Sequence, residues 1–264
     1  MKWKTLGFLN SAGFALLLCG SVPAVAQSLG TAGSFAVLGG STVTNTGPSS
    51  IVGNLGVSPG NAVTGFPPGL VTGGSIHAGD ALALQAQNDA TTAYNVLAGQ
   101  ACNTDLTGQD LGGLTLTPGV YCFSSSAQLT GVLTLSGAGT YVFQIGSSLT
   151  TASGSSVVLT NGASACDVWW QLGSSATVGT AASLPGNVLA LTSITLNTGA
   201  SISGRALAQT GAVTLDGNNV SGCSTATSVV QVPALSGGGM ILLVALLVLA
   251  GWAAMRRLRS APLT

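Results

Sequence analysis

Apolar and small polar residues alternate in short runs along most of the chain, and the runs end at Gly, Asn or Pro. The regularity is greatest in two consecutive stretches, 186–203 and 204–221, in which Leu189 matches Leu207. Side chains alternate between the two faces of a strand, so such runs place apolar residues inside and Thr or Ser outside. A short period of this kind is typical of a β-solenoid, whose stacked coils bring equivalent residues into ladders.

Threonines recur at equivalent positions of this repeat. One set follows an interval of 18 residues and then a one-residue slip, and we predict that its members share one face: Thr177, Thr180, Thr195, Thr198 and Thr214. Thr192 and Thr210, with Ser174, form another equivalent set, which we assign to a second face. Because Thr is a good strand former on any solenoid exterior, the ladders alone are also compatible with a purely structural role.

The remaining stretches complete the expected solenoid. Residues 34–71 alternate between turns at Gly and Pro and are predicted to form coils at one end. From Ala78 to Ala98 the period becomes helical, and Gly99 suits a C-terminal cap. We predict a packing helix along the flank of the solenoid, with an apolar stripe made of Ala81, Leu82, Gln85, Ala86, Ala90, Ala93, Tyr94 and Leu97.

A second block of strands runs from Leu114 to Leu172 and includes the pair Trp169-Trp170. Alternation puts at least one of these two indoles on the outside or at a junction between coils. We favour a packing role for it over carbohydrate stacking.

Composition and charge limit the partners. The chain of 264 residues is 46% hydrophobic and only 5% charged, unlike a disordered protein. Its acidic residues are six Asp, and between the basic termini the single base is Arg205. The central region therefore lacks the basic face that would neutralise phosphates, which argues against nucleic-acid binding.

The charged residues are too scattered for a hydrolytic site. A polysaccharide lyase or hydrolase would need clustered carboxylates, or a base with a metal ion. We therefore predict that the protein is not an enzyme. Asp80 is assigned to the first turn of the helix and Asp89 to its solvated face, while Arg205 is expected to pair with Asp216 or to cap a strand, and His77 to be structural.

Both ends of the chain suggest export. Residues 1–26 combine an early basic pair, an apolar run and small residues before a cleavage site, as in a signal peptide. Residues 225–235 form a polar linker to 236–264, an apolar run with a basic end that is typical of a transmembrane helix. We expect residues 27–224 to form a solenoid domain at the cell envelope or surface, or secreted.

Four cysteines remain outside the leader: Cys102, Cys122, Cys166 and Cys223. An even number in an exported chain favours disulfides. Three pairings are possible, and we favour Cys102–Cys122 with Cys166–Cys223. A metal site is disfavoured because no CxxC spacing exists and His77 is the single histidine, and no cofactor is predicted.

Several short motifs occur in one order along the central region: Gly53-Asn-Leu-Gly-Val-Ser-Pro-Gly60, Gly65-Phe-Pro-Pro-Gly69, Ile76-His-Ala-Gly-Asp80, Leu116-Thr-Pro-Gly-Val-Tyr121, Gly173-Ser-Ser-Ala-Thr177 and Gly204-Arg-Ala-Leu-Ala208. With these motifs the chain resembles the bacterial and fungal ice-binding-protein-like domain. The resemblance implies a mainly β fold, an irregular and roughly triangular right-handed β-solenoid flanked by one long α-helix. It also implies an ice surface as the partner of Thr-x-x-Thr motifs. Thr177-Val-Gly-Thr180 and Thr195-Leu-Asn-Thr198 match, whereas Thr214-Leu-Asp-Gly217 loses the second Thr and gains a charge.

The C-terminal segment resembles an exosortase-type sorting signal. The similarity lies in the motif residues Val232, Pro233, Leu235 and Ser236, the apolar run, and the basic pair Arg256 and Arg257. It implies a processing enzyme as a partner, and a plain membrane anchor is the alternative.

Two functions therefore follow from the sequence. The first is ice binding through a flat Thr-rich face, acting as an antifreeze, in inhibition of ice recrystallisation or in ice adhesion. The second is a structural or adhesive cell-surface protein that binds a glycan or another surface without ice activity.

Overall fold

The structure is a computed structural model that describes residues 27–223. The expected signal peptide, linker, sorting motif and C-terminal transmembrane segment lie outside the described residues. Within 27–223 no helix is both long and apolar enough to cross a membrane.

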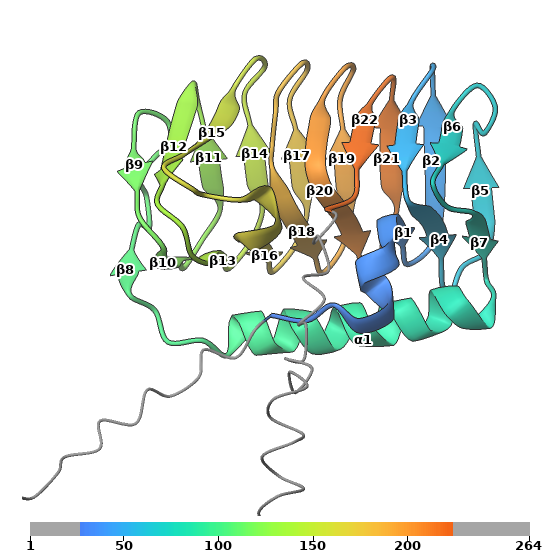
Figure 1. Cartoon of the computed structure of the whole chain (residues 1–264), viewed down its shortest axis with the longest axis horizontal. Coiled ribbons are helices and arrows are strands. Elements are labelled where there is room, and N and C mark those ends of the chain that lie inside the picture. Colours follow the sequence, from blue (N-terminus) through green and yellow to red (C-terminus); the bar gives the residue numbers. More distant parts are fainter. Residues whose placement is uncertain (1–26, 224–264) are drawn as a thin grey trace, which may run out of the picture.

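The described chain is a stack of coils in which every strand pair is parallel (Figure 1). One side of the stack is a seven-stranded sheet, in the order β11 (Ala127–Leu129), β14 (Leu149–Thr151), β17 (Ala176–Val178), β19 (Ile194–Leu196), β21 (Val213–Asp216), β2 (Thr42–Thr46) and β5 (Ala62–Thr64).

A second side, which we call the helix face, runs in the order β8 (Thr104–Asp105), β10 (Gly119–Phe123), β13 (Tyr141–Ile145), β16 (Val168–Leu172), β18 (Gly186–Ala190), β20 (Ser201–Ala208), β1 (Phe35–Gly39), β4 (Asn54–Val57) and β7 (Ile76–Ala78). The third side consists of β9 (Thr115–Leu116), β12 (Val132–Ser136), β15 (Ser156–Thr160), the first half of β20, β22 (Asn219–Ser221), β3 (Ser50–Val52) and β6 (Leu70–Thr72). The prediction of a mainly β fold with parallel sheets and one long helix is confirmed.

The coils do not stack in the order of the sequence. The N-terminal coil, β1 to β3, pairs with the last coil, as in the register of Val43 with Val213 and of Ile51 with Val220. The helix α1 (Ala81–Ala98) then runs along the stack and returns the chain to its far end, where β8 begins (Figure 1). Eighteen helical residues span about 27 Å, which suits this return.

The interior is filled by ladders of apolar side chains. Tyr121, Phe143 and Trp170 occupy equivalent positions of β10, β13 and β16. Their rings stack, with centroids 5.4 Å apart for the first pair and 4.1 Å for the second. The Trp170 indole N–H donates to the carbonyl of Pro185 at 3.0 Å. Trp169 lies on the outer side of the same strand, but it is buried in the apolar cluster beneath the helix, which supports packing rather than carbohydrate stacking.

The helix begins later than predicted, at Ala81, because Asp80 caps it: the Asp80 carboxylate accepts from the backbone N–H of Ala83 at 2.8 Å. The predicted stripe was wrong in the first turns, where Ala81, Leu82 and Gln85 are exposed. The residues that pack instead are Ala83, Ala86, Gln87, Ala90, Ala93 and Leu97. Four of these residues are alanines, whose small size lets the helix lie close to the sheet.

Asp89 was predicted to lie on the solvated face of the helix, but it is not simply a solvated residue. Its carboxylate accepts from the backbone N–H of Thr31 at 2.6 Å and thereby fastens the 3-10 helix η1 (Gly30–Ser34) to α1. Gln85 Nε2 donates to the same carboxylate at 2.8 Å.

One of the two favoured disulfides is present. Cys102, which follows α1, is bonded to Cys122 in β10. The second is not formed in the structure: Cys166, in the short 3-10 helix η2 (Ala165–Asp167), and Cys223 are both free thiols. Arg205 does not pair with Asp216, since its guanidinium is buried among carbonyl groups on the opposite side of the coil.

Candidate functional site

The seven-stranded sheet carries one row of outward side chains that crosses every strand. Residue pairing between neighbouring strands puts them in the order Gln128, Thr150, Thr177, Thr195, Thr214, Thr44 and Thr64. We call this row the threonine ladder. Six steps between strands, at about 4.8 Å each, give it a length of about 29 Å.

The local sequence explains why these side chains face outward. In β19, Thr195 stands between Ile194 and Leu196, and both of these are buried in the interior. Strand alternation therefore forces the threonine to the outside. The same arrangement recurs in β17 and β21, where apolar residues flank Thr177 and Thr214. The ladder thus rests on a continuous apolar core.

Threonine suits a regular row because its branched Cβ restricts the χ1 rotamer. Side chains from adjacent strands also lie close enough to interact: Thr44 Oγ1 donates to Thr214 Oγ1 at 3.4 Å. The methyl and hydroxyl groups are therefore held at positions that repeat from coil to coil.

Small side chains accompany the ladder on both sides. On the side nearer the helix face, backbone hydrogen bonds between coils align Ser126, Ser148, Ser175, Ser193 and Ala212. On the other side they align Thr180, Thr198, Asp216 and Thr46. The surface around the ladder therefore has little relief.

The seven strands carry a single ionisable side chain, Asp216. Its carboxylate accepts from Thr198 Oγ1 at 2.5 Å. Strand β21 departs from the Thr-x-x-Thr motif at this point, and the neighbouring coil supplies the hydroxyl that satisfies the acid.

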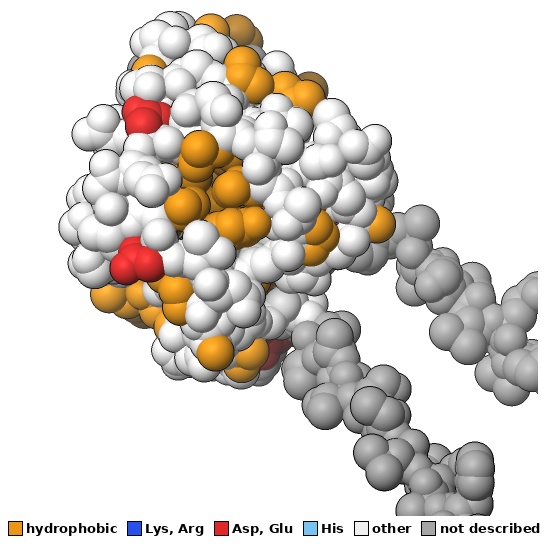
Figure 2. All heavy atoms as spheres, turned by 90° about the vertical axis from the view of Figure 1, so that its left-hand side faces the viewer, with side chains coloured by type: hydrophobic (Ala, Val, Ile, Leu, Met, Phe, Trp, Pro, Cys, Tyr) orange, Lys and Arg blue, Asp and Glu red, His pale blue; other side chains and the backbone are white. Residues whose placement is uncertain are grey.

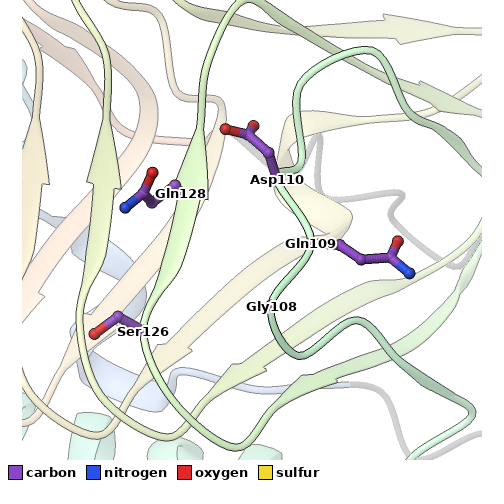
Figure 3. A pocket seen from close by; sticks show the side chains of 5 residues that line it. All are labelled: Gly108, Gln109, Asp110, Ser126 and Gln128. Atoms are coloured by element: carbon purple, nitrogen blue, oxygen red, sulfur yellow. The ribbon is translucent and has the colours of Figure 1, made fainter.

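The ladder ends at a polar hollow of about 220 Å³ lined by Gly108, Gln109, Asp110, Ser126 and Gln128 (Figure 3). Asp110 Oδ2 accepts from Thr130 Oγ1 at 2.6 Å, and Oδ1 accepts from the backbone N–H groups of Gly112 and Thr130 at 2.7 and 2.9 Å. Burial alone would raise the pKa of this carboxyl, but the bonds from Thr130 and Gly112 outweigh it and lower the pKa. Asp110 thus binds the chain segments at the edge of the sheet. Among the described residues, the hollow is lined by no second carboxylate that could take part in acid–base chemistry.

Figure 2 looks onto this end of the stack, where hydrophobic side chains gather among separated acidic ones and no basic side chain is visible. The partly buried Leu114 and Leu116 of the terminal coil pack on the interior cluster here.

The structure separates the predicted threonines into three groups. Thr177, Thr195 and Thr214 lie in the ladder, and Thr180 and Thr198 lie in the row beside it. Contrary to the prediction, Thr192 and Thr210 do not form a second face. They lie in the turns between the helix face and the seven-stranded sheet, where Thr210 Oγ1 donates to the carbonyl of Leu191 at 2.7 Å.

Sequence reasoning missed four members of the ladder: Gln128, Thr150, Thr44 and Thr64. The alternation of Thr42-Val43-Thr44 was a usable signal for a strand. The place of Thr44 in the ladder, however, depends on its pairing with Thr214, which lies 170 residues away in the sequence.

Comparison with known proteins agrees with this architecture. The sequence model of the ice-binding-like family matches residues 37–221. The chain belongs to the ice-binding-like family. An ice-binding protein of Nostoc sp. (strain HG1) is 64% identical over 170 residues, which are 63% of this chain and 62% of that protein. An ice-binding protein of Colwellia sp is 39% identical over 186 residues, covering 64% of this chain and 73% of the relative.

Solved structures of this family share the fold. An ice-binding protein from an Antarctic biological consortium superposes with a TM-score of 0.71 and 48% identity, covering 74% of this chain and 90% of that one. The corresponding domain of Shewanella frigidimarina ice-binding protein 1 has a TM-score of 0.70 and 34% identity, covering 75% and 98%. The described residues therefore form a family domain with the family's fold.

Proposed function

We propose that this protein binds ice through the threonine ladder. The observation that carries the proposal is the register that aligns six Thr and one Gln across all seven strands of a nearly uncharged sheet. Relatives named ice-binding proteins, including those of Nostoc and Colwellia, support it.

The chemistry of threonine explains how such a face would work. Each side chain offers a methyl group and a hydroxyl group on one stiff unit, so little rotamer entropy is lost on binding. Repeated at the spacing of the strands, these groups can order surface water into a layer that joins an ice plane. Ionised groups would hold water in a competing geometry, and the sheet has only Asp216, which is engaged with Thr198.

The experiment is to observe a single ice crystal in a solution of the protein while the temperature is lowered slowly. We expect faceting and a gap between the melting and growth temperatures. Thr195→Tyr places a bulky ring in the ladder and should abolish the effect. Ser203→Tyr is the matched control, because Ser203 is exposed on the third side of the same coil and should tolerate the ring.

The result also decides the alternative. Freely growing round crystals in the presence of folded wild-type protein would exclude ice binding and favour the structural or adhesive function. Nothing in the geometry of the described residues favours catalysis, because Asp80, Asp89, Asp105 and Asp110 each accept a hydrogen bond from a backbone N–H group.

We further propose that the domain works outside the cytoplasm. The Cys102–Cys122 disulfide supports this, because such bonds persist mainly in oxidising compartments. Processing of the C-terminal segment by an exosortase-type enzyme, or its use as a membrane anchor, is proposed from the sequence. Fractionation of cells, with the mass of the mature chain, tests both points.

A further inference from the structure

Cys166 and Cys223 are held at one point by the buried side chains of Arg205 and Asn187. Arg205 Nη2 donates to the carbonyl of Cys223 at 2.8 Å, and Arg205 Nη1 donates to Asn187 Oδ1 at 2.7 Å. Asn187 Nδ2 in turn donates to the carbonyl of Cys166 at 3.1 Å. The two cysteine backbones are therefore linked through adjacent side chains.

The same guanidinium also binds the beginning of the domain. Arg205 Nε and Nη2 both donate to the carbonyl of Gly33, at 3.1 and 2.6 Å. Arg205 is 7% exposed, and burial lowers its pKa. Its partners in the described chain are three neutral oxygen atoms, so its role is to join three segments that are distant in sequence.

Each of the two cysteines is thus held in this network by its own backbone carbonyl. A rigid frame that brings two thiols together lowers the entropy lost when they bond. From this geometry we propose that Cys166 and Cys223 form a second disulfide site, oxidised by exchange with a disulfide of a dithiol protein or a small molecule.

The exchange takes place in two steps. The Cys166 thiolate attacks the acceptor disulfide, forms a mixed disulfide and releases one acceptor thiolate. The Cys223 thiolate then attacks the Cys166 sulfur, forms the Cys166–Cys223 bond and releases the second acceptor thiolate. The protein loses two electrons and two protons, and the acceptor disulfide becomes two thiols.

The environment of Cys223 sets the order of the two steps. Burial raises the pKa of Cys223 to about 12, which disfavours its thiolate in the free pair, so we assign the first attack to the other cysteine. The guanidinium of Arg205 favours the Cys223 thiolate that the second step requires.

The bond would close the segment 166–223, which contains the strands of Thr177, Thr195 and Thr214. Closing a loop of this length in the unfolded chain stabilises the folded state. For a domain of this size we expect a rise in Tm on the order of 10 °C. This inference does not depend on ice binding.

The distribution of basic residues supplies a direct test on the full chain. Lys and Arg occur at 2, 4, 205, 256, 257 and 259, so trypsin cuts the central region only after Arg205. Cys102, Cys122 and Cys166 fall before the cut and Cys223 after it. A link between the two large fragments therefore reports a bond to Cys223.

The protein is treated with oxidised glutathione, its free thiols are blocked with N-ethylmaleimide in urea, and it is then digested. We expect the fragments ending at Arg205 and beginning at Ala206 to stay joined until a reductant is added. Cys102→Ser should keep the link and Cys166→Ser should lose it. Separation without reductant, or a link that persists in Cys166→Ser, would overturn the proposal.

A stability measurement tests the consequence of the bond. In a Cys102→Ser, Cys122→Ser background only the proposed disulfide and the leader cysteine can change on reduction. The Tm of the oxidised protein should fall on reduction, and the Cys166→Ser variant of that background should show no such fall. An equal response in both proteins would count against a structural bond at this site.

Discussion

A bulky substitution in the threonine ladder should act according to its position. Thr195 is the fourth of the seven members, so three remain on either side of it, whereas Thr64 is the last. A Tyr ring at Thr195 therefore leaves at most three consecutive members for a flat ice plane. The same ring at Thr64 leaves six.

The difference in adsorption follows from how many members of the ladder can still touch one ice plane. Burying one methyl group contributes about 0.5–0.8 kcal/mol. Thr195→Tyr removes four members from the longest uninterrupted row and should cost about 2–3 kcal/mol, or roughly 30- to 200-fold in affinity. Thr64→Tyr removes one and should cost roughly two- to fourfold.

The assay is the protein concentration that half-inhibits recrystallisation of polycrystalline ice, measured with wild type, Thr64→Tyr, Thr150→Tyr and Thr195→Tyr. Thr150→Tyr, at the second position, should be intermediate, because five consecutive members remain. Circular dichroism and Tm should match wild type, since none of these threonines belongs to the buried core. Equal losses at Thr64 and Thr195 would refute the idea that continuous contact along the ladder carries the activity.

Other predictions concern stability. Trp170→Phe should destabilise the domain by about 2 kcal/mol in urea unfolding, because the buried indole loses volume and leaves the Pro185 carbonyl unbonded; a change below about 0.5 kcal/mol would contradict this. The N–H of Thr31 holds the pKa of Asp89 below its usual value of 3.8, so the Asp89 carboxylate stabilises the fold fully above pH 3.8 and loses this effect as the pH falls through the lower pKa of the folded state. Between neutral pH and about pH 2, the Tm of Asp89→Asn should therefore fall less than the Tm of wild type. Gly204→Ala should cost about 2–4 kcal/mol or prevent folding, because φ is +150° and a Cβ would overlap the Gly186 carbonyl oxygen of the neighbouring coil; a Tm close to that of wild type would exclude the clash.

The repeat read from the sequence corresponds to true structural equivalence. Leu189 pairs with Leu207, and Thr195 pairs with Thr214 after the one-residue slip. Periodicity succeeds here because each coil must return its apolar residues to the same narrow core. The strands and their facing could therefore be predicted from these residues.

The neighbours of the N-terminal coils could not be predicted in the same way. Residues 34–71 lie at one end of the stack, as predicted, but the coil beside them is formed by the last strands rather than by the next ones. This pairing is set by backbone hydrogen bonds and general apolar packing, which leave no distinctive sequence pattern. The ladder members Thr44 and Thr64 were missed for that reason.

The polar contacts of individual side chains could not be predicted from the periodic pattern either. Asp89 occupies a helix position that periodicity assigns to solvent, yet it binds Thr31 from a distant segment. Arg205 likewise finds backbone carbonyls rather than the carboxylate expected for a lone base. Charge counting identifies such residues as unusual but does not identify neutral partners.

The meeting of Gly33 and Cys223 at Arg205 also decides how the domain can be mounted. Gly33 precedes a helix-face strand and Cys223 follows a strand of the third side, so both of these residues lie at the edge opposite the seven-stranded sheet. A fluorescent reporter, a surface linker or a second domain joined directly after Cys223 would then start from the side of the molecule opposite the threonine ladder. A domain immobilised through this edge would present the threonine ladder on the side that faces away from the support.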